Sequence, residues 1–131
     1  MSRPDRSEPA RRWLRWADED LEIARHTAAV PELVARGACV WAHQAAEKAI
    51  KALLVFHNID PPKLHDLDRL VQRLPVRERA GLMGLELPQL TRWSIEGRYP
   101  ADLDEATAAD AASAIEIATT VIELVRARVE T

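Results

Sequence analysis

The stretch from residue 39 to residue 54 divides sharply into apolar and polar positions. At about 100° per residue, five polar side chains fall within one arc of about 140°: His43, Gln44, Glu47, Lys48 and Lys51. The opposite arc is mostly alanine, with Cys39, Ile50 and Leu53. Small side chains let a neighbouring helix approach closely, so this pattern predicts a helix at the centre of a bundle. A solvated surface helix gives a similar pattern and is the competing interpretation.

Apolar spacing also predicts a helix before the central one. It begins near Pro9 and ends at Val30-Pro31, because the residue before a proline is pushed out of the α region. Its expected core stripe, widened by Trp16 and Ile23, is Ala10, Trp13, Ala17, Leu21, Ala24 and Ala28. The central helix then starts between residues 33 and 38 and runs to about His57, where Asn58 is placed to take the left-handed conformation that closes a helix.

Proline and glycine divide the rest of the chain. Pro61-Pro62 predicts a stiff, extended connector, after which Asp66 is a natural N-cap for a short helix that Pro75 ends. Two helical pieces follow, broken between residues 84 and 88, and residues 97–100 form a corner. Asp102 to Glu105 is expected to open the last helix with a carboxylate-rich first turn.

The last helix carries two apolar stripes side by side. One contains Ala111, Ile115, Ala118, Ile122, Val125 and Val129, and the other contains Ala114, Ile117, Val121 and Leu124. A helix that is apolar over so wide an arc must be covered from two sides. The second cover can be another copy of the chain, so the sequence predicts a homodimer.

Composition narrows the class of protein. With 131 residues, no strand signal and no apolar run long enough to cross a membrane, the sequence predicts one all-α domain over residues 9–131 after a flexible arm of residues 1–8. The single cysteine gives no disulfide framework and fits a reduced, cytoplasmic protein. The net charge of −3 argues against a generally basic nucleic-acid binder. We expect no metal and no cofactor, because the lysines beside His43 and Glu47 oppose a bound cation.

Three separate stretches resemble the HEPN domain family, whose name stands for higher eukaryotes and prokaryotes nucleotide-binding. They are the run from His43 to Leu54, Pro61-Pro62 followed by His65-Asp66-Leu67, and Arg98-Tyr99-Pro100. Asp20-Leu21 is similar to an acidic-Leu pair early in the family. The resemblance covers roughly residues 11–128, which is essentially the whole domain.

The resemblance implies a five-helix, up-and-down bundle, dimerisation, and work beside a small nucleotidyltransferase encoded nearby, as in toxin–antitoxin systems. It implies that the chain binds a nucleotide or a nucleotidylated partner. The residues carried over by position are His43, Gln44, Glu47, Lys48, Lys51, His65, Asp66, Arg98 and Tyr99.

A metal-independent ribonuclease toxin is the alternative within the same family. Its members resemble one another in an Arg-x(4–6)-His motif near the last helix, but no histidine follows Arg98 in this chain. Arg36 and His43 satisfy the spacing in a different helix, so they are the candidate catalytic pair. Because the motif is incomplete in its usual place, the sequence leaves enzymatic activity open and favours binding.

The chemistry of the polar residues suits an anion. Lys48, Lys51 and Arg98 can neutralise phosphate, His43 and His65 can donate hydrogen bonds, and Tyr99 can stack on a base. The sequence predicts that residues from the central helix, from the start of the third helix and from the corner at 97–100 converge. The competing interpretation is a salt-bridge network that fixes helix packing, in a structural interaction module without a ligand.

Overall fold

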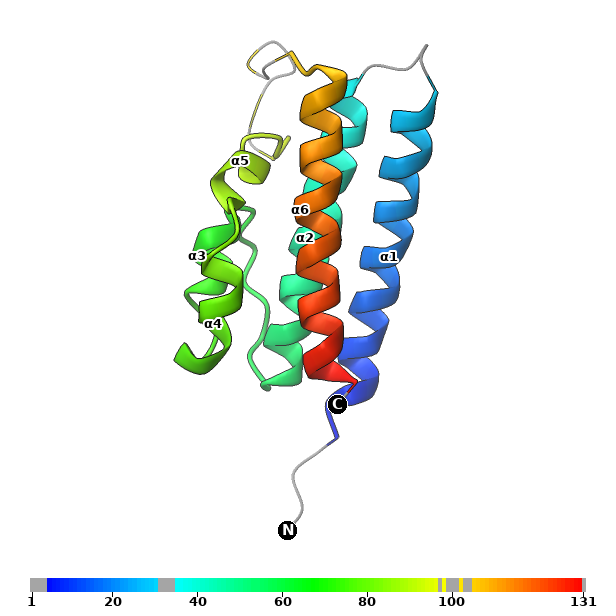
Figure 1. The fold of residues 1–131 in the computed structure, drawn as a ribbon. Coiled ribbons are helices and arrows are strands. Elements are labelled where there is room, and N and C mark those ends of the chain that lie inside the picture. Colours follow the sequence, from blue (N-terminus) through cyan, green and yellow to red (C-terminus); the bar gives the residue numbers. More distant parts are fainter. Residues whose placement is uncertain (1–4, 31–34, 97, 99–101, 103–104, 131) are drawn as a thin grey trace.

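The computed structural model describes residues 5–30, 35–96, 98, 102 and 105–130. These residues form six helices and no strand: α1 Ser7–Ala29, α2 Ala35–Phe56, α3 Leu67–Val71, α4 Val76–Met83, α5 Leu87–Thr91 and α6 Ala108–Val129. Of the three long helices, α1 runs antiparallel to both α2 and α6, which run in the same direction, and the short α3, α4 and α5 lie along one side of them (Figure 1). The all-α prediction is confirmed, with six helices in this part of the chain instead of five.

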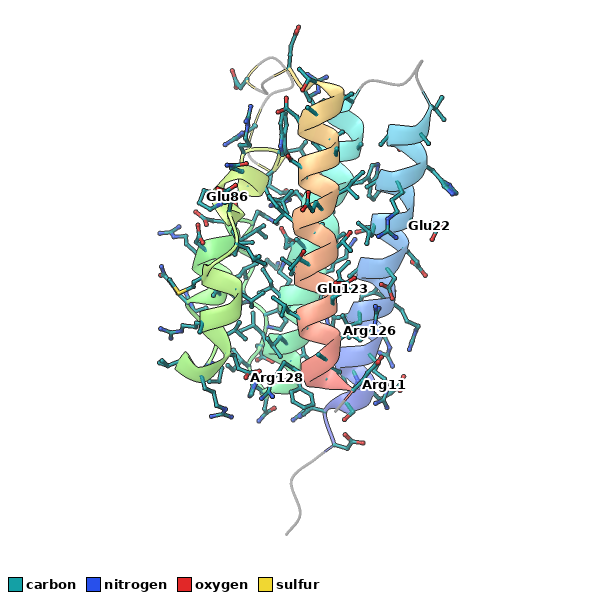
Figure 2. All side chains as sticks on the ribbon, in the orientation of Figure 1. Arg11, Glu22, Glu86, Glu123, Arg126 and Arg128 are labelled. Carbon is teal, nitrogen blue, oxygen red and sulfur yellow. The ribbon has the colours of Figure 1, made fainter. Side chains whose placement is uncertain are left out.

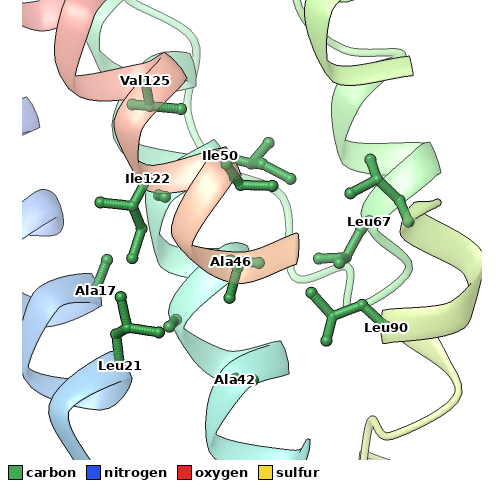
Figure 3. Close-up of a cluster of buried hydrophobic side chains, with 14 of the residues drawn as sticks. Ala17, Leu21, Ala42, Ala46, Ile50, Leu67, Leu90, Ile122 and Val125 are labelled. Carbon is green, nitrogen blue, oxygen red and sulfur yellow. The ribbon is translucent and has the colours of Figure 1, made fainter. Parts of the chain in front are cut away.

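The alanine-rich face of α2 explains its central place. α2 packs against α1 and α6 on one side and against α3 and α5 on the other. Ala42, Ala46 and Ala49 have no exposed surface, and Figure 3 shows Ala46 among larger side chains of the core. Small residues at these positions let the long helices approach closely. Because the polar arc also turns inward, the interpretation of α2 as a solvated surface helix is wrong.

The end of α2 follows the prediction for Asn58. Its φ is +61°, in the left-handed region. The Asn58 N–H donates to the Val55 carbonyl and the Ile59 N–H to the Leu54 carbonyl, both at 2.9 Å, which is the bonding pattern of a Schellman motif. The chain therefore leaves α2 in a fixed direction, toward the connector that carries His65.

Three expectations about helices need correction. α1 begins at Ser7, two residues before Pro9, and its buried stripe includes Leu14. Trp16 and Ile23 do not widen the core, because each is 40% exposed and lies beyond its edge, and Ala28 is exposed as well.

α6 does not start with the carboxylates. It begins at Ala108, where Thr107 and Asp110 form a capping box with bonds of 3.1 and 2.9 Å. Two reciprocal hydrogen bonds satisfy free N–H groups directly, which outweighs the favourable charge of an acidic first turn.

The described residues contain no helix long and apolar enough to cross a membrane. Of the predicted arm of residues 1–8, residues 1–4 lie outside the described residues.

Candidate functional site

A buried polar network occupies the inward-turned arc of α2. His43 is fully buried, and Glu47 and Lys51 are almost so. They stand one turn apart on α2, so their side chains follow one another along the same face of the helix. Polar groups in such a place are stable only when they are paired, so the pairing decides what the network can do.

His65 joins this network from the connector before α3. Its backbone carbonyl accepts a hydrogen bond from Nε2 of His43 at 2.8 Å, and its own Nδ1 lies 2.9 Å from Oε1 of Glu47. The other carboxylate oxygen of Glu47 accepts from Nζ of Lys51 at 3.1 Å. The connector therefore returns His65 to α2 and fastens it there at two points.

His43 is held neutral by its surroundings. Burial lowers its pKa below 6.5, and this outweighs the opposing effects of the His65 carbonyl and of the Glu47 carboxylate. Because Nε2 donates to a carbonyl, Nδ1 carries the lone pair, and it is buried with no hydrogen-bond partner among the described residues. His43 as it stands cannot contact RNA, and Arg36, its partner in the ribonuclease alternative, lies two turns earlier on the same helix.

Lys48 is engaged elsewhere. Its Nζ donates to Asp20 of α1, a carboxylate that is itself almost fully buried. Mixed charge along α1 is typical of a solvated face, so charge spacing gives no signal for this pair. The only sequence signal for Asp20 is the resemblance of Asp20-Leu21 to the family pair. Gln44 lies one turn before Lys48, half-buried on the same strip of α2.

Asp66 and Arg98 do not enter the network. Asp66 caps α3, because its Oδ1 accepts from the Arg69 N–H at 3.3 Å. Arg98 is exposed and donates to the Arg92 carbonyl at 2.8 Å, with no hydrogen bond or ion pair to the polar residues of α2 among those the structure describes. Tyr99 lies outside the described residues.

One residue missed from the sequence connects the network to the surface. Oε2 of Glu96 lies 3.8 Å from Nε2 of His65, and Glu96 is two residues before Arg98. The His65 side chain is 34% exposed, whereas Glu47 behind it is buried. His43, Glu47 and Lys51 are thus buried, whereas the His65 side chain is partly exposed to solvent. No group of three or more metal-ligating side chains comes together within the described ranges.

A second polar cluster, at the far end of α2, was also missed. The buried Glu78 of α4 accepts from Nε and Nη2 of Arg128 on α6, both at 3.0 Å, and lies 3.1 Å from Nε2 of His57. These bonds lower the pKa of Glu78 against the opposing effect of burial. Since the three residues are far apart in the chain, local spacing gives no signal for the cluster.

Comparison with known proteins agrees with this architecture. Residues 10–128 match the family described as HEPN domain. The fold is similar to the crystal structure of TT1696 from Thermus thermophilus, with a TM-score of 0.77 and 26% identity over 91% of this chain and 97% of that one. It is also similar to that of ST0689, an archaeal HEPN homologue, with a TM-score of 0.70 and 24% identity over 98% and 99% of the two chains. No curated protein sequence matches the chain.

Proposed function

The chain belongs to the HEPN domain family, and on that premise we propose that it binds a nucleotide or a nucleotidylated protein partner. In this proposal it works beside a small nucleotidyltransferase, in the manner of a toxin–antitoxin pair. The observation that carries the proposal is the position of His65, which links a buried ionic network to the surface. A ligand that binds at His65 contacts a side chain whose orientation is already fixed by the buried residues of the network.

The fixed orientation comes from the residues that bind His65. Glu47 accepts from Nδ1 of His65 and is itself held by Lys51, and His43 holds the backbone at the same residue. A preorganised side chain loses little conformational freedom on binding. His43, Glu47 and Lys51 therefore act as positioning residues in this proposal, and Nε2 of His65 is the atom offered to the ligand.

We assign the phosphate and the base to the other residues that the family resemblance includes in the site. Arg98 is exposed close to Glu96 in the chain, and its guanidinium suits a phosphate. Gln44 and Lys48 on the neighbouring strip of α2 offer an amide and an ammonium group. Tyr99, which the family resemblance includes in the site, is assigned the stacking role because an aromatic ring can stack on a base.

Calorimetric titration with AMP and ATP at low salt tests the proposal. His65→Asn keeps an N–H near Glu47 and removes Nε2, while Arg98→Gln removes the charge. We expect each change to weaken binding by about tenfold, the usual effect of losing a charge-assisted hydrogen bond. Arg73→Gln is the matched control, because Arg73 is exposed after α3 and outside the network. Absence of nucleotide binding, or equal losses in all three variants, contradicts the proposal.

A structural interaction module without a ligand is the second candidate. It is favoured by the pairing of both lysines, Lys48 with Asp20 and Lys51 with Glu47, because an anion would have to compete with two carboxylates. On this interpretation Lys51→Met lowers the free energy of unfolding by about 3–5 kcal/mol, since the buried Glu47 loses its cation, and neither AMP nor ATP binds.

We also propose that the protein is a homodimer through the face formed by α1 and α2. Trp16 and Ile23 lie about one turn on either side of Asp20, and Trp41 lies two turns before Lys48. The ion pair between Asp20 and Lys48 joins these two strips into one surface. Trp41 is 37% exposed, and Trp16 and Ile23 are each 40% exposed, so apolar surface remains along both helices of this face.

A further inference from the structure

The end of the bundle where α1 begins holds a cavity of about 560 Å³, well away from the His65 opening. It is lined by the start of α1, the end of α2 and one residue of α4: Asp5, Arg6, Ser7, Phe56, His57, Asn58 and Arg77. Figure 1 shows that α1 begins, α2 ends and α6 ends at this same end of the molecule. We propose that this cavity binds an organic phosphate monoester, whose phosphate lies between Arg6 and Arg77.

Unmet hydrogen-bond donors are the first support. Nε of Arg6 is buried and has no partner, and neither the Arg6 nor the Arg77 side chain forms a hydrogen bond or ion pair with another described residue. Buried N–H groups are nearly always paired, so Nε of Arg6 is a donor that an acceptor bound in the cavity would satisfy. Two arginines that line one cavity match the several oxygens of a phosphate.

The neighbouring arginine of α6 shows the contrast. Arg128, at the same end of the bundle (Figure 2), places two nitrogens on Glu78 at 3.0 Å. The Arg128 guanidinium group is therefore occupied by a carboxylate of the protein itself, and His57 binds the same carboxylate. Arg6 and Arg77 have no such internal acceptor among the described residues, which leaves their guanidinium groups available to a ligand.

The charge of the lining also favours an anion. Asp5 is the one carboxylate that lines this cavity among the described residues. Its Oδ1 accepts from the Ser7 N–H at 2.9 Å, and this backbone bond lowers the pKa of Asp5, which favours the ionised carboxylate. One negative charge faces two positive ones, before any charge on His57 is counted.

The apolar part of the ligand has a place beside the phosphate. Arg77 also lines a second cavity of about 390 Å³, so the two cavities adjoin. The second one has an apolar wall of Leu53, Leu82 and Leu124, with Gly81 of α4 at its side. A ligand that spans both places its phosphate at the arginines and its apolar group against the leucines. Together the cavities have a volume typical of small-molecule sites.

Nitrogen-15 spectroscopy of the arginine Nε–H groups tests the proposal on the full chain, with inorganic phosphate and phenyl phosphate as probes. We expect both probes to shift the Arg6 Nε–H signal in a saturable way, and phenyl phosphate to bind more tightly. Arg6→Gln and Arg77→Gln should each weaken binding by about tenfold, because each removes a charge-assisted contact. Arg73→Gln removes the same charge elsewhere and should leave the affinity unchanged.

Gly81→Leu separates the two parts of the ligand. A side chain at Gly81 points toward Leu124, since a Cβ there would lie 3.8 Å from Cδ1 of that residue. It should fill the apolar cavity and abolish the advantage of phenyl phosphate over phosphate, without changing the affinity for phosphate itself. Unshifted Arg6 signals, or equal losses in all three arginine variants, overturn the proposal. Neither result bears on nucleotide binding at His65, which depends on different residues.

Discussion

At the scale of single residues, His43 decides how the network behaves toward protons. It is fully buried and donates through Nε2, and its Nδ1 has no hydrogen-bond partner in the part of the chain that the structure describes. A proton on Nδ1 would place a charge in the core. Glu47 and Glu96 oppose the effect of burial, and the ring of His65 adds to it, but burial prevails and the pKa falls.

The lowered pKa of His43 predicts a loss of stability in weak acid. In the unfolded chain the imidazole takes up a proton as the pH falls below about 6.5, whereas in the folded protein it stays neutral. The unfolded state then binds more protons, so the free energy of unfolding should fall by up to about 1.4 kcal/mol per pH unit below that value. Chemical denaturation between pH 7.5 and pH 5.5 measures this slope.

His43→Gln supplies the control for this prediction. The glutamine amide can still donate to the His65 carbonyl but does not titrate. The variant should show a flatter dependence on pH over the same range, although its stability at pH 7.5 is lower. If the two proteins have equal slopes, other groups cause the pH dependence and His43 is not held neutral by the fold.

Residue chemistry in the sequence predicted part of the site. Helical spacing places His43, Glu47 and Lys51 on one face, and the prolines before His65 bring it back to them. Burial could not be predicted, because a polar arc has the same period whether it faces water or other helices. The partner of Lys48 comes from another helix 28 residues away, so tertiary packing alone determines that ion pair.

At the scale of elements, the helices with strong local signals were predicted best. Asn58 closes α2 and Asp66 caps α3 as expected, because each effect depends on bonds within a few residues. The start of α6 was wrong because two local signals competed. The carboxylates before Thr107 favour a helix start through charge alone, whereas the capping box adds two hydrogen bonds.

Because α2 packs closely against its neighbours, one larger side chain on its alanine face should have a large effect on stability. Ala46 has no exposed surface and lies among Ile50, Leu90 and Ile122 of the core (Figure 3). Ala46→Leu should lower the free energy of unfolding by about 1–3 kcal/mol, because overpacking forces the long helices apart. Thermal or chemical denaturation measures the loss.

Ala112→Leu is the matched control for that change. Ala112 lies on the exposed side of α6, where a leucine has room. Its stability should stay close to that of the parent protein. If Ala46→Leu has an equally small effect, the alanine face of α2 is loosely packed, and the central role of this helix is not supported by its packing.

At the scale of the whole molecule, more apolar surface stays exposed on α1 than on α6 after folding. Packing of α4 and α5 against α6 covers much of its second stripe, since Ala114 and Val121 are buried and Ile117 is half-buried. Sequence periodicity showed how wide the apolar arc of α6 is, but not that the same chain covers it. The argument for a partner copy therefore moves to Trp16, Ile23 and Trp41.

A dimer through that face is the prediction for the intact protein. A stable interface buries about 800 Å² per partner, roughly a tenth of the 7740 Å² surface of this chain, and exposed tryptophans are the side chains that contribute most to such contacts. Light scattering should give twice the chain mass of 14.7 kDa, and Trp16→Glu should shift the protein toward the monomer.

Leu124→Glu is the control for the dimer prediction, because it adds the same charge on α6 and should leave the dimer intact. A monomer mass for the parent protein contradicts dimerisation, whereas a dimer broken by Leu124→Glu but not by Trp16→Glu places the interface on α6. Because Gln44 and Lys48 lie on the same strip as Trp41, a dimer through α1 and α2 would also bring the partly exposed polar residues of both copies close to one another.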